Sequence, residues 1–321
     1  MLIIRKAGLF TTIQDLGRPG LRRFGISSGG AMDTSAFRIA NLLVGNPENS
    51  AAIEVTMNGP EILFAQSAEI ALCGADLSPA INGTDAPMWR PVQIEAGDVL
   101  SFGMPKSGCR TYLAIAGGIQ VPSVMNSAST LTRAGIGGFC GRALRKGDQL
   151  SIGESRSTKT TKAVNWYVSP CFRTDSPEDP IIRLLKGRHH ALFGAGSHER
   201  LTTEPFVVTN EADRMGYRLD GPPLTLEKPQ ELLSEAVIPG TIQVPASGNP
   251  IVLMADCQTT GGYPKIGQIA AVDLPVAAQL RPGQQVRFEL ISTEQAQEEW
   301  FVQERLLRHL KAGILTKRRN A

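Results

Sequence analysis

Short runs of apolar residues, or of alternating apolar and polar residues, recur along most of the chain between Gly, Asn, Asp and Pro. Such runs are typical of β-strands. The clearest strand candidates are "AIEVTMNG" (52–59), "EILFAQ" (61–66), "AEIALCGAD" (68–76), "PVQIEAGDVLSFG" (91–103) and "RTYLAIAGG" (110–118). Their close spacing favours a barrel or a sandwich over βαβ units, so we expect a mostly β fold.

Few stretches have the periodicity of a helix. In "DTSAFRIANLLVGN", Asp33 is placed to cap a helix with one apolar stripe, and Gly45 ends it before Pro47. A second helix is expected at the C-terminus, where Ser292 and Gln295 fit a capping box. We interpret the basic end "TKRRNA" as a frayed tail.

Two parts of the chain are similar to each other. The segments "GGIQVP" (117–122) and "GTIQVP" (240–245) share five of six residues, and a Met and a polar, glycine-rich loop follow each. Each part then closes on a turn and a strand, "GDQLSIG" and "GQQVRFEL". We therefore expect two related β lobes: residues 1–165 with one helix, and residues 166–321 with the C-terminal helix.

The amino-acid composition indicates which classes of binding partner to expect. The 321 residues are 42% hydrophobic and 20% charged with a formal net charge of +3, which gives no reason to expect nucleic acid or a membrane as partner. The five cysteines are scattered without a CxxC pair, so neither disulfides nor zinc are expected. The four histidines suggest no metal site either. We expect a cytoplasmic protein that acts on a small molecule.

Familiar nucleotide and nucleophile motifs are missing or incomplete. The chain has no GxxxxGK[ST] phosphate loop, and "GIGGFCG" misses the dinucleotide-binding spacing. "GISSG" (25–29) matches the GxSxG pattern around Ser27, but "GLRRF" before it is no buried strand, so we prefer a Ser/Gly-rich turn. No AMKM-like stretch is present for covalent biotin attachment, so any biotin would be carried by another chain.

The stretch "DCQTTGGYP" (256–264) and the lysine that follows it carry the strongest candidate chemistry. An apolar run from 251 to 255 precedes it and predicts a core strand that delivers the loop to one place. The loop offers two glycines for close backbone approach, three hydroxyls and one charge of each sign: Gly261, Gly262, Thr259, Thr260, Tyr263, Asp256 and Lys265. Such a loop can orient a small amide or carboxylate and stabilise charge that develops on its oxygen. The alternative is a tight structural turn.

Two further stretches carry charged pairs. "DRMGYRLDG" (213–221) places Arg214 and Arg218 four residues apart beside Asp213, and arginines can hold a carboxylate. The alternative is a solvated pair or a salt bridge to a neighbouring aspartate. "TTIQDLGRPG" (11–20) places Asp15 and Arg18 about a glycine turn. All five residues are candidates for substrate binding.

Together these stretches are similar to one family. "TTIQDLGRPG", "GISSGGAMD", "NGPEILF", "YLAIAGGI", "DRMGYRLDG", "GTIQVPASGNPIVLMADCQTTGGYPKIG" and "LRPGQQVRF" resemble the biotin-dependent carboxyltransferase family that includes the C component of 5-oxoprolinase, the Kip antagonist and the second component of allophanate hydrolase. The resemblance covers about residues 3–291. One departure is Asp213, because the family usually has Asn before "RMGYRL".

The resemblance implies a cyclophilin-like β-barrel architecture and a role in an ATP-dependent 5-oxoprolinase. There, the C component works with a Kip-inhibitor-like B component and with a separate A component to convert 5-oxo-L-proline to L-glutamate. For this substrate we expect Arg214 and Arg218 to bind the carboxylate. We expect the amide to be oriented or polarised by Asp256, Thr259, Thr260, Gly262, Tyr263 and Lys265. No general base is assigned, and ATP would be bound by an unrecognised loop or a partner chain.

Two alternatives stay open. The first is a carboxyltransferase component that acts on urea or a similar amide with biotin carried by another chain. The second is a regulator without catalysis that binds a Kip-type inhibitor of a histidine kinase.

Overall fold

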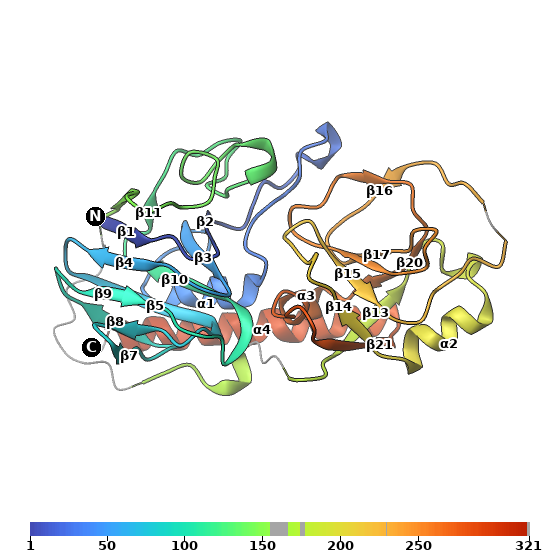
Figure 1. The fold of residues 1–321 in the computed structure, drawn as a ribbon. Coiled ribbons are helices and arrows are strands. Elements are labelled where there is room, and N and C mark those ends of the chain that lie inside the picture. Colours follow the sequence, from blue (N-terminus) through green and yellow to red (C-terminus); the bar gives the residue numbers. More distant parts are fainter. Residues whose placement is uncertain (155–165, 174–176, 229, 320–321) are drawn as a thin grey trace. The chain divides into compact units, whose positions relative to one another are not determined.

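The computed structural model of the protein describes residues 1–154, 166–173, 177–228 and 230–319 (Figure 1). The chain forms two compact units. Unit 1 comprises Met1–Arg18, Gly29–Asp175 and Arg305–Ala321, and unit 2 comprises Pro19–Ser28 and Ser176–Glu304. A segment near the N-terminus thus belongs to unit 2, and the last part of the C-terminal helix belongs to unit 1. The lobe boundary predicted between residues 165 and 166 borders residues 155–165, which lie outside the described ranges.

Unit 1 contains two antiparallel sheets. One has the order β11-β12-β1-β4-β9-β6-β7 and the other the order β2-β3-β10-β5-β8. The strands are β1 (Leu2–Lys6), β2 (Phe10–Gln14), β3 (Ala52–Thr56), β4 (Glu61–Phe64), β5 (Ala68–Asp76), β6 (Ala80–Ile81), β7 (Thr84–Asp85), β8 (Pro91–Ile94), β9 (Val99–Ser101), β10 (Ser107–Ile115), β11 (Ile119–Gln120) and β12 (Gln149–Ile152). Every strand candidate named from the sequence between residues 52 and 118 is confirmed.

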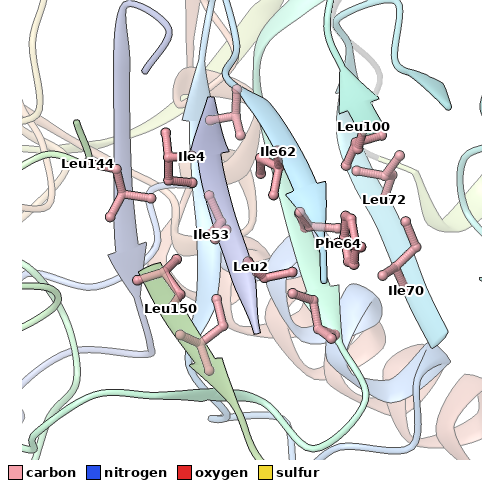
Figure 2. Packing of buried hydrophobic residues seen from close by; sticks show 14 of the residues in the cluster. Leu2, Ile4, Ile53, Ile62, Phe64, Ile70, Leu72, Leu100, Leu144 and Leu150 are labelled. Atoms are coloured by element: carbon pink, nitrogen blue, oxygen red, sulfur yellow. The ribbon is translucent and has the colours of Figure 1, made fainter. Parts of the chain in front are cut away.

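The core of unit 1 lies between the two sheets. Figure 2 shows Leu2 and Phe64 from one sheet facing Ile53, Ile70 and Leu72 from the other, and all of them are fully buried. Successive side chains of a strand point to opposite faces, so these large aliphatic and aromatic residues alternate with residues that face away from the sandwich. The unit is therefore a sandwich, one of the two architectures that the strand spacing favoured.

The outer face of the second sheet is covered by helices. Small side chains line this face, among them Ala52, Ala71 and Ala114, and they pack in one cluster with residues of α1 (Thr34–Leu43) and of the C-terminal helix. The small residues leave space for the helices, and the larger Tyr112 of β10 packs its ring edge-on against Phe37 of α1. The predicted cap is confirmed: Asp33 accepts a hydrogen bond from the Ala36 backbone N–H at 2.9 Å.

Unit 2 is built on a closed barrel with the strand order β13-β20-β17-β18-β15-β14-β21. The barrel strands are β13 (Ile181–Lys186), β14 (Phe206–Val208), β15 (Gly216–Asp220), β17 (Thr241–Gln243), β18 (Ile251–Leu253), β20 (Lys265–Ile269) and β21 (Gln285–Leu290). A separate pair joins β16 (Glu235–Ala236) to β19 (Thr260–Gly261). Buried and exposed residues alternate along β13 and β21, as closure around one interior requires.

The similarity between the two halves of the sequence does not extend to strand pairing. In unit 1, "GGIQVP" contains β11, which pairs with β12 from "GDQLSIG". In unit 2, the corresponding strands β17 and β21 are not neighbours in the barrel. The two β lobes are thus present, and similar segments form different neighbours within them.

Few helices cover this β framework, as expected. Besides α1, the described residues contain α2 (Ala195–Thr203), α3 (Leu274–Ala277) and α4 (Thr293–Arg319). The capping box that starts α4 is confirmed, because Ser292 and Gln295 exchange side-chain hydrogen bonds with each other's backbone N–H groups. Within the described ranges, no helix is long and apolar enough to span a bilayer.

The interpretation of "TKRRNA" as a frayed tail is wrong as far as Arg319. Helix α4 continues to that residue, and Arg318 forms an ion pair with Glu69 of β5 and donates to the Leu43 carbonyl at 2.6 Å. Both side chains of the pair are mostly buried. The long side chain of Arg318 reaches the last turn of α1, where helix carbonyls lack partners within the helix. A basic residue therefore anchors the end of α4.

We expect Arg318→Ala to destabilise unit 1 by about 3 kcal/mol, because Glu69 would stay buried without its cation. Hydrogen exchange of the β5 and β10 amides measures this loss within unit 1. Lys317→Ala, in the same turn of α4 but exposed, is the matched control and should leave the exchange rates unchanged. Equal rates in the wild type and Arg318→Ala would contradict the anchoring role.

Candidate functional site

The polar stretch 256–265 connects two barrel strands of unit 2. It leaves β18, as the apolar run before it predicted, and its middle residues Thr260 and Gly261 form β19. Strand β19 pairs with β16, and the Val237 N–H donates to the Thr259 carbonyl at 3.0 Å. The stretch is therefore an ordered excursion of the barrel that is held by residues 235–237, and we call it the 256–265 loop.

A buried ion pair fixes the start of this loop. Arg214 donates from Nε and Nη2 to the two carboxylate oxygens of Asp256, each at 2.9 Å, and both side chains are about nineteen-twentieths buried. The Asp256 N–H also donates to the Arg214 carbonyl at 2.8 Å. Two parallel charge-assisted bonds fix both the distance and the plane of the two groups.

Asp213 shapes the turn that presents Arg214. Its Oδ1 accepts hydrogen bonds from the N–H groups of Met215 at 2.7 Å and Gly216 at 3.1 Å. An asparagine has the same acceptor oxygen at this position, so either residue can form the turn. The departure from the family pattern at Asp213 is thus compatible with this local structure.

The two arginines of "DRMGYRLDG" have different surroundings. The Arg218 side chain is 56% exposed and pairs with the exposed Glu211, with Nε 2.8 Å from a carboxylate oxygen. Arg214 lies before strand β15, whereas Arg218 lies within it at an outward position. The structure therefore does not bring them together as one carboxylate clamp.

A second charged cluster fixes the end of the loop. Lys265 is buried, and its Nζ lies 3.2 Å from the Gly261 carbonyl and 3.5 Å from a Glu235 carboxylate oxygen. The same oxygen is 3.8 Å from Nε2 of His189. Glu235 and His189 were not predicted from the sequence, because neither lies in a motif and the tertiary fold alone brings them to Lys265.

The hydrogen bonds around His189 define its protonation. Its Nδ1 accepts from the Lys265 N–H at 3.2 Å, so the ring proton of the neutral form is on Nε2, which faces Glu235. Burial, followed by the nearby Lys265 ammonium, lowers the pKa of His189 below its ordinary value. The lowered pKa and the acceptor role of Nδ1 both favour the neutral imidazole beside Lys265 and Glu235.

The remaining loop residues differ in accessibility. Tyr263 is 51% exposed and Thr260 is also exposed, whereas Thr259 and Gly262 are half-buried. A Cβ on Gly261 would lie 2.6 Å from Nε2 of Gln243, so the glycine is needed there to accommodate a neighbouring side chain. The hydroxyls of Thr260 and Tyr263 are the groups that the loop presents outwards.

A segment from near the N-terminus holds the other side of the loop. Arg22 donates from Nη2 to the carbonyls of Val237 and Gln258, the latter at 2.9 Å. Ser27 donates its hydroxyl to the Cys257 carbonyl at 2.7 Å. A short 3₁₀ helix (Arg22–Phe24), not a strand, precedes "GISSG", which favours the turn interpretation over a nucleophile elbow. Burial raises the pKa of the Cys257 thiol, which makes it a poor nucleophile as well.

Asp15 and Arg18 belong to unit 1 and support a different loop. Asp15 accepts from the hydroxyl of Ser127 at 2.7 Å and from the backbone N–H groups of Gly17 and Ala128, each at 2.7 Å. Arg18 is fully buried and donates from Nε to the Val124 carbonyl at 3.1 Å. Both residues hold the polar loop that follows "GGIQVP", which is the counterpart in unit 1 of the 256–265 loop.

The described part of the chain contains no group of three or more His, Cys, Asp or Glu side chains arranged to hold a metal ion. The charged groups that line the 256–265 loop are instead two ion pairs and an arginine on backbone oxygens. This arrangement can bind and polarise an oxygen of a small ligand by hydrogen bonds and charge.

Comparison with known proteins supports the same family. The chain is 41% identical over 302 residues to the C component of 5-oxoprolinase from Escherichia coli, covering 92% of this chain and 93% of that protein. It is also 41% identical to the C component of 5-oxoprolinase from Haemophilus influenzae, covering 89% of each. Among solved structures, the urea carboxylase of Kluyveromyces lactis is similar with a TM-score of 0.88 at 30% identity, over 95% of this chain and 28% of that one.

The match to a family extends over most of both units. Residues 24–290 match the family described as the carboxyltransferase domain, subdomain A and B. This range contains the 256–265 loop, its partners Arg214, Glu235 and His189, and most of the sandwich. The chain belongs to the carboxyltransferase family that includes the C component of 5-oxoprolinase.

Proposed function

We propose that the protein is the C component of an ATP-dependent 5-oxoprolinase, which converts 5-oxo-L-proline to L-glutamate together with its A and B components. The observation that carries the proposal is the similarity to two proteins named as the C component of 5-oxoprolinase, over about nine-tenths of each chain. The 256–265 loop supports it, because buried charges and exposed hydroxyls suit a small acid with a planar amide.

Ring opening of 5-oxoproline requires that negative charge at the lactam oxygen be stabilised. Opening the ring breaks the C–N bond as water adds to the carbon, and once the lactam oxygen is phosphorylated, negative charge lies on the phosphoryl oxygens that it carries. The Lys265 ammonium is the positive group beside the loop backbone, and Glu235 and the Gly261 carbonyl hold it in place. The hydroxyls of Thr260 and Tyr263 would orient the amide, and Asp256 would hold the loop through Arg214.

We propose that ATP takes part in the reaction within the assembled complex. We propose that ATP phosphorylates the lactam oxygen and leaves as ADP. One water then adds to the carbon and expels the ring nitrogen, which gives an acyl phosphate, and a second water hydrolyses the acyl phosphate to the carboxylate and phosphate. The sequence lacks a GxxxxGK[ST] loop, so we expect one of the two partner components, or a loop without that motif, to bind ATP. Scattered cysteines without a pairing pattern are the basis for expecting a cytoplasmic complex.

The similarity to urea carboxylase supports one alternative. That structure matches nearly the whole of this chain, and a carboxyltransferase would use the same loop to bind a urea-like amide. Any biotin would be carried by another chain. Activity that avidin abolishes would favour this alternative over the oxoprolinase.

The direct test is glutamate release from 5-oxoproline and ATP by this chain purified with its A and B partners. We expect release that depends on all three components and on ATP and that is insensitive to avidin. A complete complex that releases no glutamate from 5-oxoproline would contradict the proposed function.

We expect Lys265→Met to lower kcat by about 100-fold or more, because the transition state would lose its nearest positive charge. Steady-state glutamate release by the assembled complex measures this effect. Lys186→Met replaces an exposed lysine of β13 in the same unit and is the matched control, with an expected change below about twofold. A normal kcat in the Lys265→Met complex would show that Lys265 does not stabilise the transition state.

We expect Asp15→Asn to destabilise unit 1 by about 2 kcal/mol and to leave the KM for 5-oxoproline unchanged. The amide would place an N–H₂ group against the backbone N–H of Ala128, which now donates to the carboxylate. Hydrogen exchange of the residues from 124 to 138 measures the first effect, and glutamate release the second. A raised KM with normal exchange would instead indicate that Asp15 contacts the substrate.

A further inference from the structure

Arg22 is an arginine at the 256–265 loop that the sequence did not single out. It comes from the segment 19–28 of unit 2, far from the loop in sequence. Its Nη2 donates to two backbone carbonyls and lies 3.8 Å from the sulfur of Cys257. The guanidinium is thus held rigidly at the start of the loop by groups that carry no net charge.

One nitrogen of this guanidinium has an unsatisfied hydrogen-bond donor. The Nη1 of Arg22 is buried and has no hydrogen-bond partner among the residues that the structure describes. A buried donor without an acceptor costs about 1–3 kcal/mol, and more when it is charged. Native proteins satisfy nearly all such groups, so an unpaired one indicates an acceptor that the chain itself does not supply.

A second unpaired donor lies at the same loop. Gln243 of β17 is 1% exposed, and its Nε2 likewise has no hydrogen-bond partner in the described ranges. This nitrogen faces Gly261, at the position where any larger residue would collide with it. A glycine at that position leaves room for the amide and keeps its N–H₂ group next to the loop.

Gln258 contacts both donors' side chains. Its backbone carbonyl accepts from Arg22, and its Nε2 lies 3.4 Å from Oε1 of Gln243, which is a long and weak hydrogen bond. The Gln258 side chain is half-buried, so it can swing away without opening the core. Its departure would release the Gln243 side chain from this contact.

We propose that Arg22 and Gln243 form a binding subsite for a small acid with a planar amide, and that Gln258 covers this subsite until the acid binds. The charged Nη1 of Arg22 takes an oxygen of the carboxylate, and the neutral Nε2 of Gln243 takes the amide oxygen. This inference rests on the proposed function for the identity of the acid, 5-oxoproline.

The two arginines predicted from the sequence to bind the carboxylate are less suited to this role. Arg214 already uses Nε and Nη2 on the carboxylate of Asp256, and a second carboxylate there would be repelled by the first. Arg218 is exposed and paired with Glu211, where water screens its charge. Arg22 therefore replaces the predicted arginine pair as the carboxylate contact.

The test compares two ligands that differ only by the carboxylate, 5-oxoproline and 2-pyrrolidinone. Calorimetry on the assembled complex gives the dissociation constant of each, and glutamate release is measured on the same preparation. We expect Arg22→Lys to weaken 5-oxoproline about 10- to 100-fold and 2-pyrrolidinone less than about threefold, because only the first ligand has a carboxylate for the guanidinium.

Ser27→Ala is the matched control, because it loosens the same segment from the Cys257 carbonyl and removes no donor of the subsite. It should keep the preference for 5-oxoproline. Gln243→Met, which keeps the length of the side chain and removes the amide, should weaken both ligands to the same extent. Melting temperatures close to that of the wild type show that each variant is folded.

The proposed subsite would be contradicted if Arg22→Lys left the preference for 5-oxoproline over 2-pyrrolidinone unchanged, whether it weakened both ligands equally or neither. A wild-type complex that binds neither ligand would contradict it as well. If the wild type binds 5-oxoproline with a preference that depends on Arg22 but releases no glutamate, the subsite stands and the oxoprolinase function fails. The two proposals therefore fail by different results.

Discussion

The buried pair of Arg214 and Asp256 is the interaction on which the arrangement of unit 2 around the loop depends. Two parallel hydrogen bonds join the turn before β15 to the residue where the 256–265 loop begins. Removing one partner would leave an uncompensated charge inside the protein, which costs far more than a surface pair contributes. The barrel thereby determines the first residue of the loop, and the cluster of Lys265, Glu235 and His189 determines its last.

Between these two anchors the loop is held by backbone contacts. Strand β19 pairs with β16, and Arg22 and Ser27 bind carbonyl oxygens of residues 257 and 258. Polar and glycine-rich loops normally fluctuate, because few apolar contacts oppose their conformational entropy. Here buried charges replace the missing apolar contacts, and the hydroxyls of Thr260 and Tyr263 can stay at the surface.

The polar loop of unit 1, residues 124–138, is held in a similar way. Asp15 and Arg18 are buried beneath the segment from 124 to 138 and satisfy its hydroxyls and backbone groups. In both units, then, charged residues that look like ligand-binding groups in the sequence serve first to hold a loop. The chain crosses between the units four times, because residues 19–28 belong to unit 2 and the end of α4 belongs to unit 1.

The sequence alone determined the strands between residues 52 and 118, the capped helix α1, the start of α4 and the polar loop after β18. These features are local: hydrophobic periodicity and capping residues act over a few neighbouring positions. The family also followed from the sequence, because its motifs lie in order along the chain. The roles of the loop residues remain predictions.

Only the tertiary structure decided which charges meet. Asp256 and Lys265 lie nine residues apart in one candidate loop, yet each is bound to a residue from another strand or turn. The same holds for Arg22, Glu235 and His189, which lie in no recognisable motif, and for Gln243, which lies in "GTIQVP" without having been singled out there. Ion pairs and buried donors depend on distances in space between segments that are remote in sequence, and no local pattern encodes those distances.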